Sequence, residues 1–238
     1  MAKHNKGLTL TPRLQLLADW VPEGAAFADI GTDHAYLPVW LVLHGRVSHA
    51  IASDLRKGPL ERAKETGRTY GAEGIDYRLG NGLETVEPHE ADTIAIAGMG
   101  GENIASILTA APWTADGNHT LLLAPHTKAE QLRRYLAENG YAILREALVR
   151  DRGTLYPVML VTAGEMTLTE ARIWGGAKLL HDPLGERYII ERIIRLQGAV
   201  AGSNRSDRPE DREKTERLRD TITALLELRE EWRHANCP

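Results

Sequence analysis

Turns rich in acidic residues and glycine follow four successive apolar runs in the N-terminal part of this chain. Asp29 and Gly31 follow the first run, and Asp54 ends the second run. The third run ends at GNG (80–82), and the fourth ends at AGMGG (97–101). If the runs are parallel strands, their carboxyl ends meet at one sheet edge, where ligands of open α/β sheets bind. Carboxylates for hydroxyl groups, an amide for a base and glycines for close backbone approach indicate a nucleoside site.

The first turn, which reads DIGTDHA (29–35), narrows the type of nucleoside. An acid, a glycine two residues later and a small residue at Ala35 approximate the D-x-G-x-G-x-G loop that binds S-adenosylmethionine. The dehydrogenase fingerprint G-x-G-x-x-G, whose glycines let the chain approach a pyrophosphate, is absent. S-adenosylmethionine has no phosphate and does not need that cradle. Taken singly, the D-x-G pattern is equally typical of a capped turn. Asp54, taken singly, is equally typical of a solvated acid at the end of a strand.

The elements that position these turns follow from the spacing of apolar residues. Short apolar runs alternate with amphipathic stretches, which predicts parallel βαβ units. The expected strands cover residues 25–30, 49–54, 75–79, 92–97 and 119–124. Two further extended runs, 141–149 and 155–161, are separated by RDRGT and predict an antiparallel hairpin. We therefore expect an α/β fold with a Rossmann-like class I methyltransferase sheet, mostly parallel with one antiparallel strand.

The C-terminal part of the chain has a different pattern. Apolar residues at helical spacing within 165–201 and 213–232 flank a polar segment, and this predicts an α-helical hairpin. We thus predict a methyltransferase domain at 1–163 and a helical, coiled-coil-like domain at 164–238. The apolar stripe serves packing, and the arginines of the hairpin also suit a clamp on RNA phosphates. These arginines are Arg187, Arg192, Arg195, Arg205, Arg208 and Arg212.

Composition excludes several classes of protein. Hydrophobic residues make up 42% and charged residues 26%, as in ordinary globular domains. The single cysteine, Cys237, excludes an intrachain disulfide, and the histidines lack metal-site spacing, so we expect no metal. No apolar run suits a membrane span or a signal peptide, which predicts a cytoplasmic protein without membrane contact. A net charge of −4 is not typical of nucleic-acid binding, although phosphate contacts need only a local basic patch.

A resemblance to one family becomes specific when the four turns are considered together. Four segments resemble, in order and spacing, the bacterial tRNA adenine-N1-methyltransferases that modify position 22. They are DIGTDHAYLP (29–38), SDLRKGPLERA (53–63), RLGNGLE (78–84) and IAGMGG (96–101). Arg13-Leu14 and Asn139-Gly140-Tyr141 are also similar, and the resemblance covers roughly residues 8–162. It implies S-adenosyl-L-methionine as cofactor, tRNA as partner and N1 of an adenine as methyl acceptor.

The resemblance also assigns roles to individual residues. The cofactor-binding residues that it implies are Asp29, Gly31, Asp33, Asp54, Asn81, Gly82, Ala97, Gly98 and Met99. The implied substrate-binding residues are Arg13, Gly100, Gly101 and Pro125, and the catalytic candidates are Asp33, His34 and Tyr36. Each catalytic candidate has an alternative role: donor ammonium binding for Asp33, helix capping for His34 and core packing for Tyr36. Where the family usually has G-D-G, this chain has Asn81 in place of the acid. Where the family usually has Q-P, this chain has Ala124 in place of the glutamine. Each difference alters a possible contact with a base.

The implied reaction needs little from the protein beyond alignment. The N1 lone pair of adenine attacks the sulfonium methyl in an in-line displacement after the base is unpaired and flipped into the pocket. We expect a monomer, with a dimer as the alternative. Two other functions fit the sequence: a class I methyltransferase acting on a small molecule or protein, and a non-catalytic RNA-binding relative. Methyl transfer to tRNA would distinguish the first of these, and donor binding without transfer would identify the second.

Overall fold

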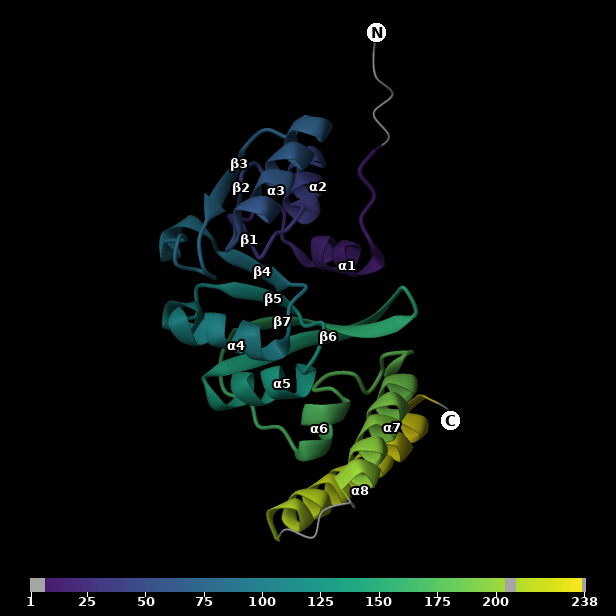
Figure 1. Cartoon of the computed structure of the whole chain (residues 1–238). Coiled ribbons are helices and arrows are strands. Elements are labelled where there is room, and N and C mark those ends of the chain that lie inside the picture. The colour runs from purple at the N-terminus through teal and green to yellow at the C-terminus, as the bar shows by residue number, and fades with distance from the viewer. Residues whose placement is uncertain (1–6, 204–208, 237–238) are drawn as a thin grey trace. The chain divides into compact units, whose positions relative to one another are not determined.

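The computed structural model describes residues 7–203 and 209–236 (Figure 1). The chain forms two compact units. One comprises Met1–Arg145 and Val149–Met166, and the other comprises Glu146–Leu148 and Thr167–Pro238. Each unit has its own architecture, and the first carries every turn that the sequence singled out.

The first unit is built on a seven-stranded sheet with the order β3-β2-β1-β4-β5-β7-β6. The strands are β1 (Phe27–Ile30), β2 (Ala50–Asp54), β3 (Ile75–Leu79), β4 (Thr93–Ala97), β5 (Thr120–Ala124), β6 (Tyr141–Asp151) and β7 (Thr154–Ala163). The first five pair in parallel, and β7 runs antiparallel to β5 with Leu122 opposite Leu160. This confirms the predicted class, a mostly parallel methyltransferase sheet with one antiparallel strand.

The order of the strands creates a crevice beside β1. This strand pairs with β2 through Asp29 and Ala52 and with β4 through Asp29 and Ala95. From β1 the chain proceeds outward to β2 and β3, whereas from β4 it proceeds to β5 on the other side. The connections therefore diverge between β1 and β4, and such a switch point leaves a ligand-binding crevice at the carboxyl ends.

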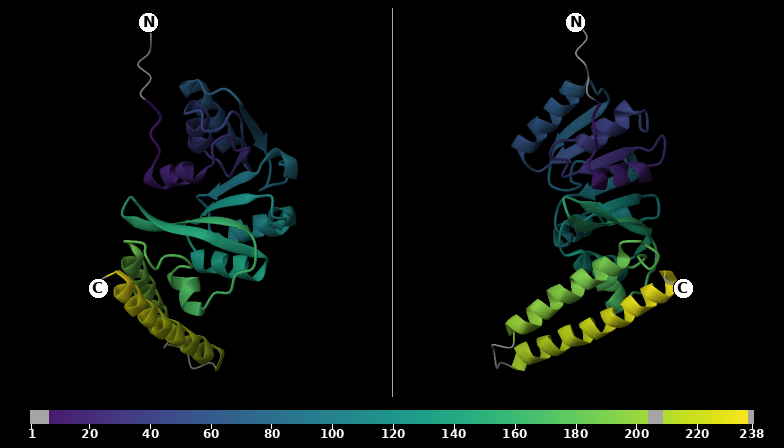
Figure 2. Two further views of the ribbon diagram at one scale, coloured as in Figure 1. Left: turned by 180° about the vertical axis from the view of Figure 1, so that it is seen from behind. Right: turned by 90° about the vertical axis from the view of Figure 1, so that its right-hand side faces the viewer.

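Helices cover the two faces of this sheet (Figure 2). They are α1 (Pro12–Trp20), α2 (Tyr36–Leu43), α3 (Lys57–Tyr70), α4 (Gly101–Ala110) and α5 (Ala129–Glu138), with short 3-10 turns η1 (Pro88–Glu90) and η2 (Pro112–Ala115). Right-handed crossovers place α2 and α3 on one face and α4 on the other. In α3, the buried residues Leu60, Ala63 and Gly67 share one face, and Gly71 ends the helix in a left-handed conformation.

The β6–β7 hairpin closes the sheet with a two-residue turn. Arg152 and Gly153, which link the strands, have φ values of 49° and 86°. Two consecutive positive φ angles are typical of the turn whose twist matches an antiparallel strand pair, and glycine adopts them without strain. The sequence RDRGT predicted a turn at this place.

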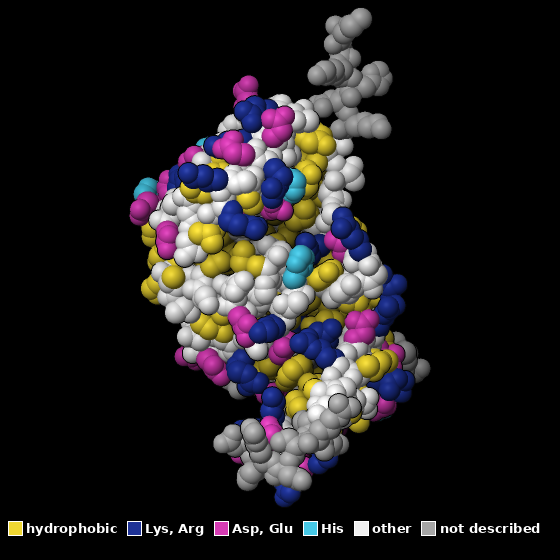
Figure 3. Space-filling model, viewed as in Figure 1, with side chains coloured by type: hydrophobic (Ala, Val, Ile, Leu, Met, Phe, Trp, Pro, Cys, Tyr) yellow, Lys and Arg dark blue, Asp and Glu magenta, His cyan; other side chains and the backbone are white. Residues whose placement is uncertain are grey.

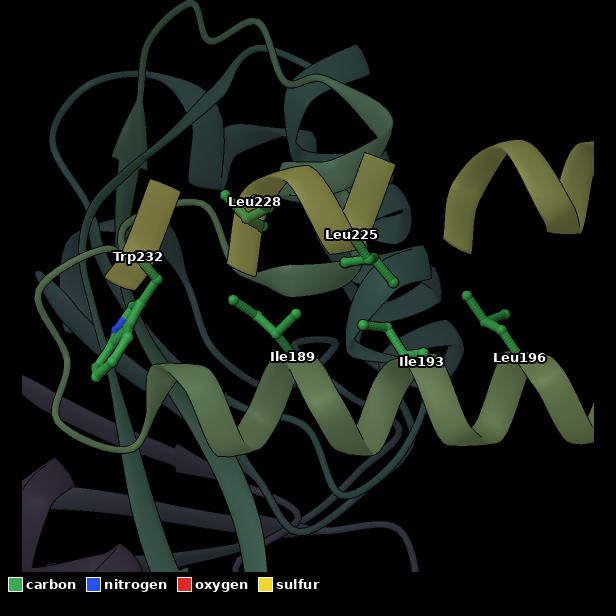
Figure 4. Packing of buried hydrophobic residues seen from close by; sticks show 6 residues of the cluster. All are labelled: Ile189, Ile193, Leu196, Leu225, Leu228 and Trp232. Atoms are coloured by element: carbon green, nitrogen blue, oxygen red, sulfur yellow. The ribbon is translucent and has the colours of Figure 1, made fainter. Parts of the chain in front are cut away.

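The second unit is helical. Its elements are α6 (Glu170–Gly175), α7 (Gly185–Ser203) and α8 (Pro209–Asn236). Ile189, Ile193 and Leu196 of α7 face Leu225 and its neighbours on α8 (Figure 4). The buried cluster also contains Leu228 and Trp232. This packing confirms the predicted C-terminal hairpin. None of the helices within the described ranges combines the length and apolarity needed to cross a membrane.

Candidate active site

A cavity of about 920 Å³ lies at the carboxyl ends of the parallel strands. Its size is in the range of sites that enclose a small molecule or cofactor. Eight of the nine residues assigned to the cofactor line it: Gly31, Asp33, Asp54, Asn81, Gly82, Ala97, Gly98 and Met99. The structure thus brings the turns after β1, β2, β3 and β4 around a single space. Asp29 alone of this group lies outside the lining.

The turn after β1 is tightly fixed to β2. The backbone N–H groups of Gly31 and Thr32 both donate to the carbonyl of Ser53, at 2.9 and 3.0 Å. Gly31 has a φ of 73°, and a Cβ there would lie 2.6 Å from Cε of Met99. The positive φ is what favours glycine here, because the Met99 methyl is the end of a flexible side chain that can move aside. Asp33 and Ala35 follow with φ values of 48° and 55°, a costly conformation for residues with a Cβ.

Asp29 supports this turn from below. Its side chain is only 6% exposed, and Oδ2 accepts a 2.6 Å hydrogen bond from the Thr32 hydroxyl. Burial raises the pKa of Asp29 to about 6, the carboxylate of Asp54 adds to the rise, and the Thr32 bond opposes it. Asp29 is therefore a buried carboxylate that the fold retains against its desolvation cost.

Asp54 is held by backbone donors at the end of β2. Its Oδ1 accepts from the Arg56 N–H at 2.9 Å and its Oδ2 from the Asp33 N–H at 3.2 Å. The residue is 6% exposed and lines the cavity. Both oxygens keep a second lone pair, so this fixed carboxylate suits the two hydroxyl groups of a ribose.

Asp33 belongs to an ion pair at the rim of the cavity. Its Oδ1 accepts from Nη2 of Arg62 at 2.6 Å, and Oδ2 lies 3.8 Å from Nε2 of His34. Half of the Asp33 side chain is exposed, which leaves it accessible to a ligand. The sequence did not single out Arg62, which sits on α3 and meets Asp33 only in the folded chain.

The other two catalytic candidates, His34 and Tyr36, are not among the residues that line the cavity. The rings of His34 and Tyr36 stack on each other with centroids 5.3 Å apart and planes 6° apart. Neither residue lines the cavity, and Tyr36 is exposed. They form an aromatic pair at the start of α2. His34 does not cap this helix, because α2 has no side-chain cap, and Tyr36 is not a core residue, because it is exposed.

The turn after β3 forms another wall of the cavity. Asn81 uses its Nδ2 to donate to Glu84 at 3.2 Å, which leaves its amide oxygen as an acceptor for an amino group. Arg78 anchors the segment that follows, donating to the Thr85 carbonyl and in bidentate fashion to Glu90. Arg78, together with the Glu87 N–H, lowers the pKa of Glu90 to about 2. Residues 84 and 86–88 of the anchored segment line the cavity.

The residues assigned to the substrate lie outside this lining. Gly101 donates to the Thr127 carbonyl at 2.8 Å, and Gly100 bridges to the same residue. Pro125 is buried immediately after β5. Gly100 and Gly101 thus fasten the turn after β4 to the turn after β5. The fourth, Arg13, lies on α1 with its guanidinium carbon 5.1 Å from the centre of the Tyr156 ring.

Several lining residues were missed by sequence reasoning. The wall includes Val86, Asn103, Ser106, Ile107 and Trp113, and Arg62 pairs with the lining residue Asp33. Asn103, Ser106 and Ile107 occupy one face of α4 directly after AGMGG, and their spacing could have revealed them. Trp113 gave no comparable signal, because η2 is a short turn whose position depends on tertiary packing.

The lining has the chemistry of a nucleoside site. Carboxylates, an amide and apolar side chains such as Leu55 and Met99 surround the cavity. In the described part of the chain, no three His, Cys, Asp or Glu residues gather as they would around a metal ion. The arrangement can hold ribose hydroxyls, an adenine amino group and an ammonium group in one pocket.

Comparisons with known proteins agree with this geometry. A family model described as "Methyltransferase domain" matches residues 10–159. The Bacillus subtilis (strain 168) tRNA (adenine(22)-N(1))-methyltransferase is 42% identical over 159 residues, which cover 66% of this chain and 67% of that protein.

Solved structures extend the similarity to nearly the whole chain. The crystal structure of the B. subtilis m1A22 tRNA methyltransferase TrmK has a TM-score of 0.85 at 33% identity, covering 93% of this chain and 99% of that one. Streptococcus pneumoniae Sp1610, solved in complex with S-adenosyl-L-methionine, has a TM-score of 0.80 at 32% identity, covering 92% of this chain and 99% of that one. With the converging turns and these matches, the chain belongs to the methyltransferase-domain family and, within it, to the TrmK-type tRNA adenine-N1-methyltransferases.

Proposed function

We propose that this protein transfers the methyl group of S-adenosyl-L-methionine to N1 of an adenine in tRNA. The observation that carries the proposal is the convergence of four strand-end turns on one cavity beside the switch point of a methyltransferase sheet. The naming of the B. subtilis relative supplies the acceptor, an adenine at tRNA position 22. A tRNA substrate also fits the cytoplasmic location expected from the sequence.

The residues of the cavity fit the proposed methyl donor. Asp54, with both oxygens oriented by backbone N–H groups, would bind the ribose hydroxyls. The free amide oxygen of Asn81 would accept from the adenine amino group. The ion pair of Asp33 and Arg62 offers opposite charges to the ammonium and carboxylate groups of the methionine end. Asp29, outside the lining, would hold the turn and not the donor itself.

The protein contributes alignment and electrostatics to the reaction. When bound, the donor supplies an electrophilic sulfonium methyl group, which the N1 lone pair of a flipped-out adenine attacks in line. Alignment of two reactants in a closed site accounts for most of such an acceleration, and no strong base is needed. Asp33, a half-exposed carboxylate that lines the cavity, is the first candidate for a polar contact to the adenine N6 amino group, and binding of the donor ammonium group is its alternative role. His34 and Tyr36 offer a stacked aromatic surface next to it.

Incubation with labelled donor and unmodified tRNA tests the proposal. Nucleoside analysis should detect 1-methyladenosine, and a tRNA with guanosine at position 22 should remain unmodified. Transfer to small metabolites or proteins in place of tRNA would favour the alternative methyltransferase function. Donor binding without transfer to any tRNA would identify a non-catalytic RNA-binding relative.

The arginines of the helical unit form a second part of the proposal, a contact with the tRNA backbone. Arg195 is exposed, Arg187 pairs with Glu191 at 3.1 Å, and Arg192 lies 4.7 Å from the Tyr188 ring. Arg205 and Arg208 lie outside the described residues. Acidic and basic side chains are interspersed on the face in Figure 3, so a phosphate contact depends on local arginines and not on a broad basic field. Replacing Arg187, Arg192 and Arg195 with glutamine should weaken tRNA binding and reduce its salt dependence; unchanged affinity would leave packing as the hairpin's role.

A further inference from the structure

A cluster of three side chains lies next to the donor cavity without lining it. It joins Arg13 of α1, Tyr156 of β7 and His126 from the turn after β5. The guanidinium carbon of Arg13 lies 5.1 Å from the Tyr156 ring centroid. The His126 ring centroid lies 5.2 Å from that of Tyr156, with the planes inclined by 44°. Segments that are far apart in the sequence thus place one cation and two aromatic rings together.

A backbone hydrogen bond connects this cluster to the wall of the cavity. The N–H of His126 donates to the carbonyl of Met99 at 2.8 Å, and Met99 lines the cavity. Gly100, the next residue, bridges to Thr127. A methyl acceptor must reach the donor from beside it, and this backbone contact places the turn that carries His126 next to one wall of the donor cavity.

Arg13 has hydrogen-bonding capacity that the fold does not use. Its Nε and Nη1 atoms are buried, and none of the described residues accepts a hydrogen bond from them. Buried guanidinium N–H groups are normally paired, and their preferred partners are carboxylate and phosphate oxygens. Burial lowers the pKa of Arg13, and the carboxylate of Asp151 opposes this, but an arginine stays charged at neutral pH. Arg13 is therefore an incompletely paired cation held against Tyr156.

The two rings have the exposure and charge state that stacking requires. His126 is exposed and Tyr156 is partly exposed. Partial desolvation of the imidazole, followed by the positive charge of Arg13, lowers the pKa of His126, so the ring is neutral at pH 7. The other charged group that faces it is Asp151, whose effect on the pKa is opposite and smaller. Neutral aromatic rings beside an arginine are a common surface for unpaired bases of RNA.

We propose that Arg13, Tyr156 and His126 form an acceptor-side site that binds an unpaired nucleotide of the RNA substrate. The base of this nucleotide lies against the two rings, and its phosphate accepts hydrogen bonds from Arg13 after a small side-chain adjustment. The inference rests on the proposed function, because it names the part of the tRNA that the chain contacts beside the donor. It extends the substrate-binding role of Arg13 to Tyr156 and His126, which sequence reasoning did not single out.

Variants of Arg13, compared with a matched control, test the phosphate contact. The control is Arg68→Gln, which removes one exposed arginine of α3 that pairs with Glu65. Arg13→Gln should weaken tRNA binding by about tenfold and reduce the slope of log affinity against log salt by about one. Arg68→Gln should change neither quantity. Affinity for S-adenosyl-L-methionine, measured by calorimetry, should stay the same in both variants.

Variants of Tyr156 test the stacking contact. Tyr156→Leu should weaken tRNA binding by about tenfold, because base–aromatic stacking is lost. Tyr156→Phe keeps the ring and should recover most of that loss. If the rings only pack α1 against β7, both Arg13→Gln and Tyr156→Leu should instead lower the melting temperature and donor affinity together. If Arg13→Gln does not fold, Arg13→Lys replaces it as the test variant, because lysine keeps the charge but not the planar guanidinium.

Failure of this inference is distinguishable from failure of the proposed function. A wild-type protein that methylates no tRNA overturns the proposed function. A wild-type protein that methylates tRNA, with Arg13→Gln and Tyr156→Leu binding tRNA as the wild type does, overturns only the acceptor-side site.

Discussion

Two buried charged groups of the sheet unit, Asp29 and Arg13, have fewer partners than Glu186 of the α7–α8 hairpin. At the cavity edge, Asp29 is buried with a single hydroxyl partner, and Arg13 has two buried nitrogen atoms without an acceptor among the described residues. In the hairpin, Glu186 accepts from both Arg229 and Arg233, at 2.9 and 2.7 Å, whereas Nε of Arg192 is buried without an acceptor among the described residues.

The two regions also differ in how much strained backbone they contain. The described non-glycine residues with positive φ are Asp33, Ala35, Lys128 and Arg152, and all four belong to the sheet unit. Two of them lie in the turn that lines the cavity. Strained backbone and incompletely paired charges reduce stability, and a fold keeps them where a ligand is to complete the contacts. The comparison indicates that the sheet edge is shaped for binding and the hairpin for packing.

The hairpin core should give the largest change in stability. Leu225 is fully buried between α7 and α8, and Leu225→Ala should destabilise the helical unit by about 2–5 kcal/mol. Its neighbour Leu226 is 46% exposed, and Leu226→Ala should cost less than about 1 kcal/mol. Hydrogen exchange of α7 and α8 measures both changes. Donor affinity should be unaffected, and a parallel loss of donor binding would contradict separate roles for the two regions.

Replacement of Asp29 should stabilise the protein. Its folded pKa of about 6 exceeds an unfolded value near 4, so its contribution to stability is lost as pH rises from about 4 to 6. Asp29→Asn keeps an oxygen for Thr32 and removes the cost of burying the ionised carboxylate. The free energy of unfolding should therefore increase by up to roughly 3 kcal/mol above pH 6. The gain should fade below pH 4. Denaturant unfolding between pH 4 and 8 measures it, and a loss of stability at pH 7.5 would show that Asp29 is not a costly charge.

The anchor of the β3 turn should have a smaller effect, on binding and not on global stability. Arg78→Gln breaks the contacts to Thr85 and Glu90 that fix the cavity wall. We expect the KM for the donor to rise about tenfold with little change in kcat, as for a loss of 1–2 kcal/mol in hydrogen bonds to charged groups. Arg78→Lys should restore part of the affinity. A fall of kcat of the same size, with an unchanged KM, would instead show that Arg78 acts in the chemical step.

The smallest effect is expected for an ion pair of the hairpin. Glu186→Gln removes a carboxylate whose pKa is lowered by Arg233 and Arg229, so its contribution is present at neutral pH and is lost as pH falls below about 4. Partly exposed pairs of this kind contribute about 0.5–1 kcal/mol. Thermal unfolding at pH 7 should show a slight destabilisation, opposite in sign to that of Asp29→Asn. A stabilisation would mean that Glu186, like Asp29, is a charge that lowers stability.

The fold was predictable because it depends on local patterns. Five apolar runs that end in Gly, Asp, Asn or Pro predicted the parallel strands, and RDRGT predicted the turn of the hairpin. The predicted ends of the strands lie within about two residues of the observed ends. Apolar spacing in the C-terminal part gave the two helices whose buried faces meet at Leu225. These features depend on residues close in sequence, which is why periodicity revealed them.

The site was predictable only in part, because its remaining contacts join distant segments. The acids and glycines at strand ends were visible in the sequence, since every parallel strand ends at the same edge. Arg62 reaches Asp33 from a different helix, and Tyr156 meets Arg13 from 143 residues further along the chain. No spacing in a single sequence reports such contacts. The position of Asp29, buried beneath the turn and not in the cavity lining, likewise depends on side-chain direction within the fold.

Calorimetric titration of the protein with S-adenosyl-L-methionine, alone and with Asp54→Asn, tests the central claim most directly. Asp54 lines the cavity and both its oxygens are oriented by backbone N–H groups, so the neutral variant should bind the donor roughly 10- to 100-fold more weakly while keeping the same fold. Saturable binding to the wild type with that loss is the predicted result. Absence of binding to a folded wild-type protein, or equal affinity in the variant, would contradict the assignment of the strand-end turns to the methyl donor.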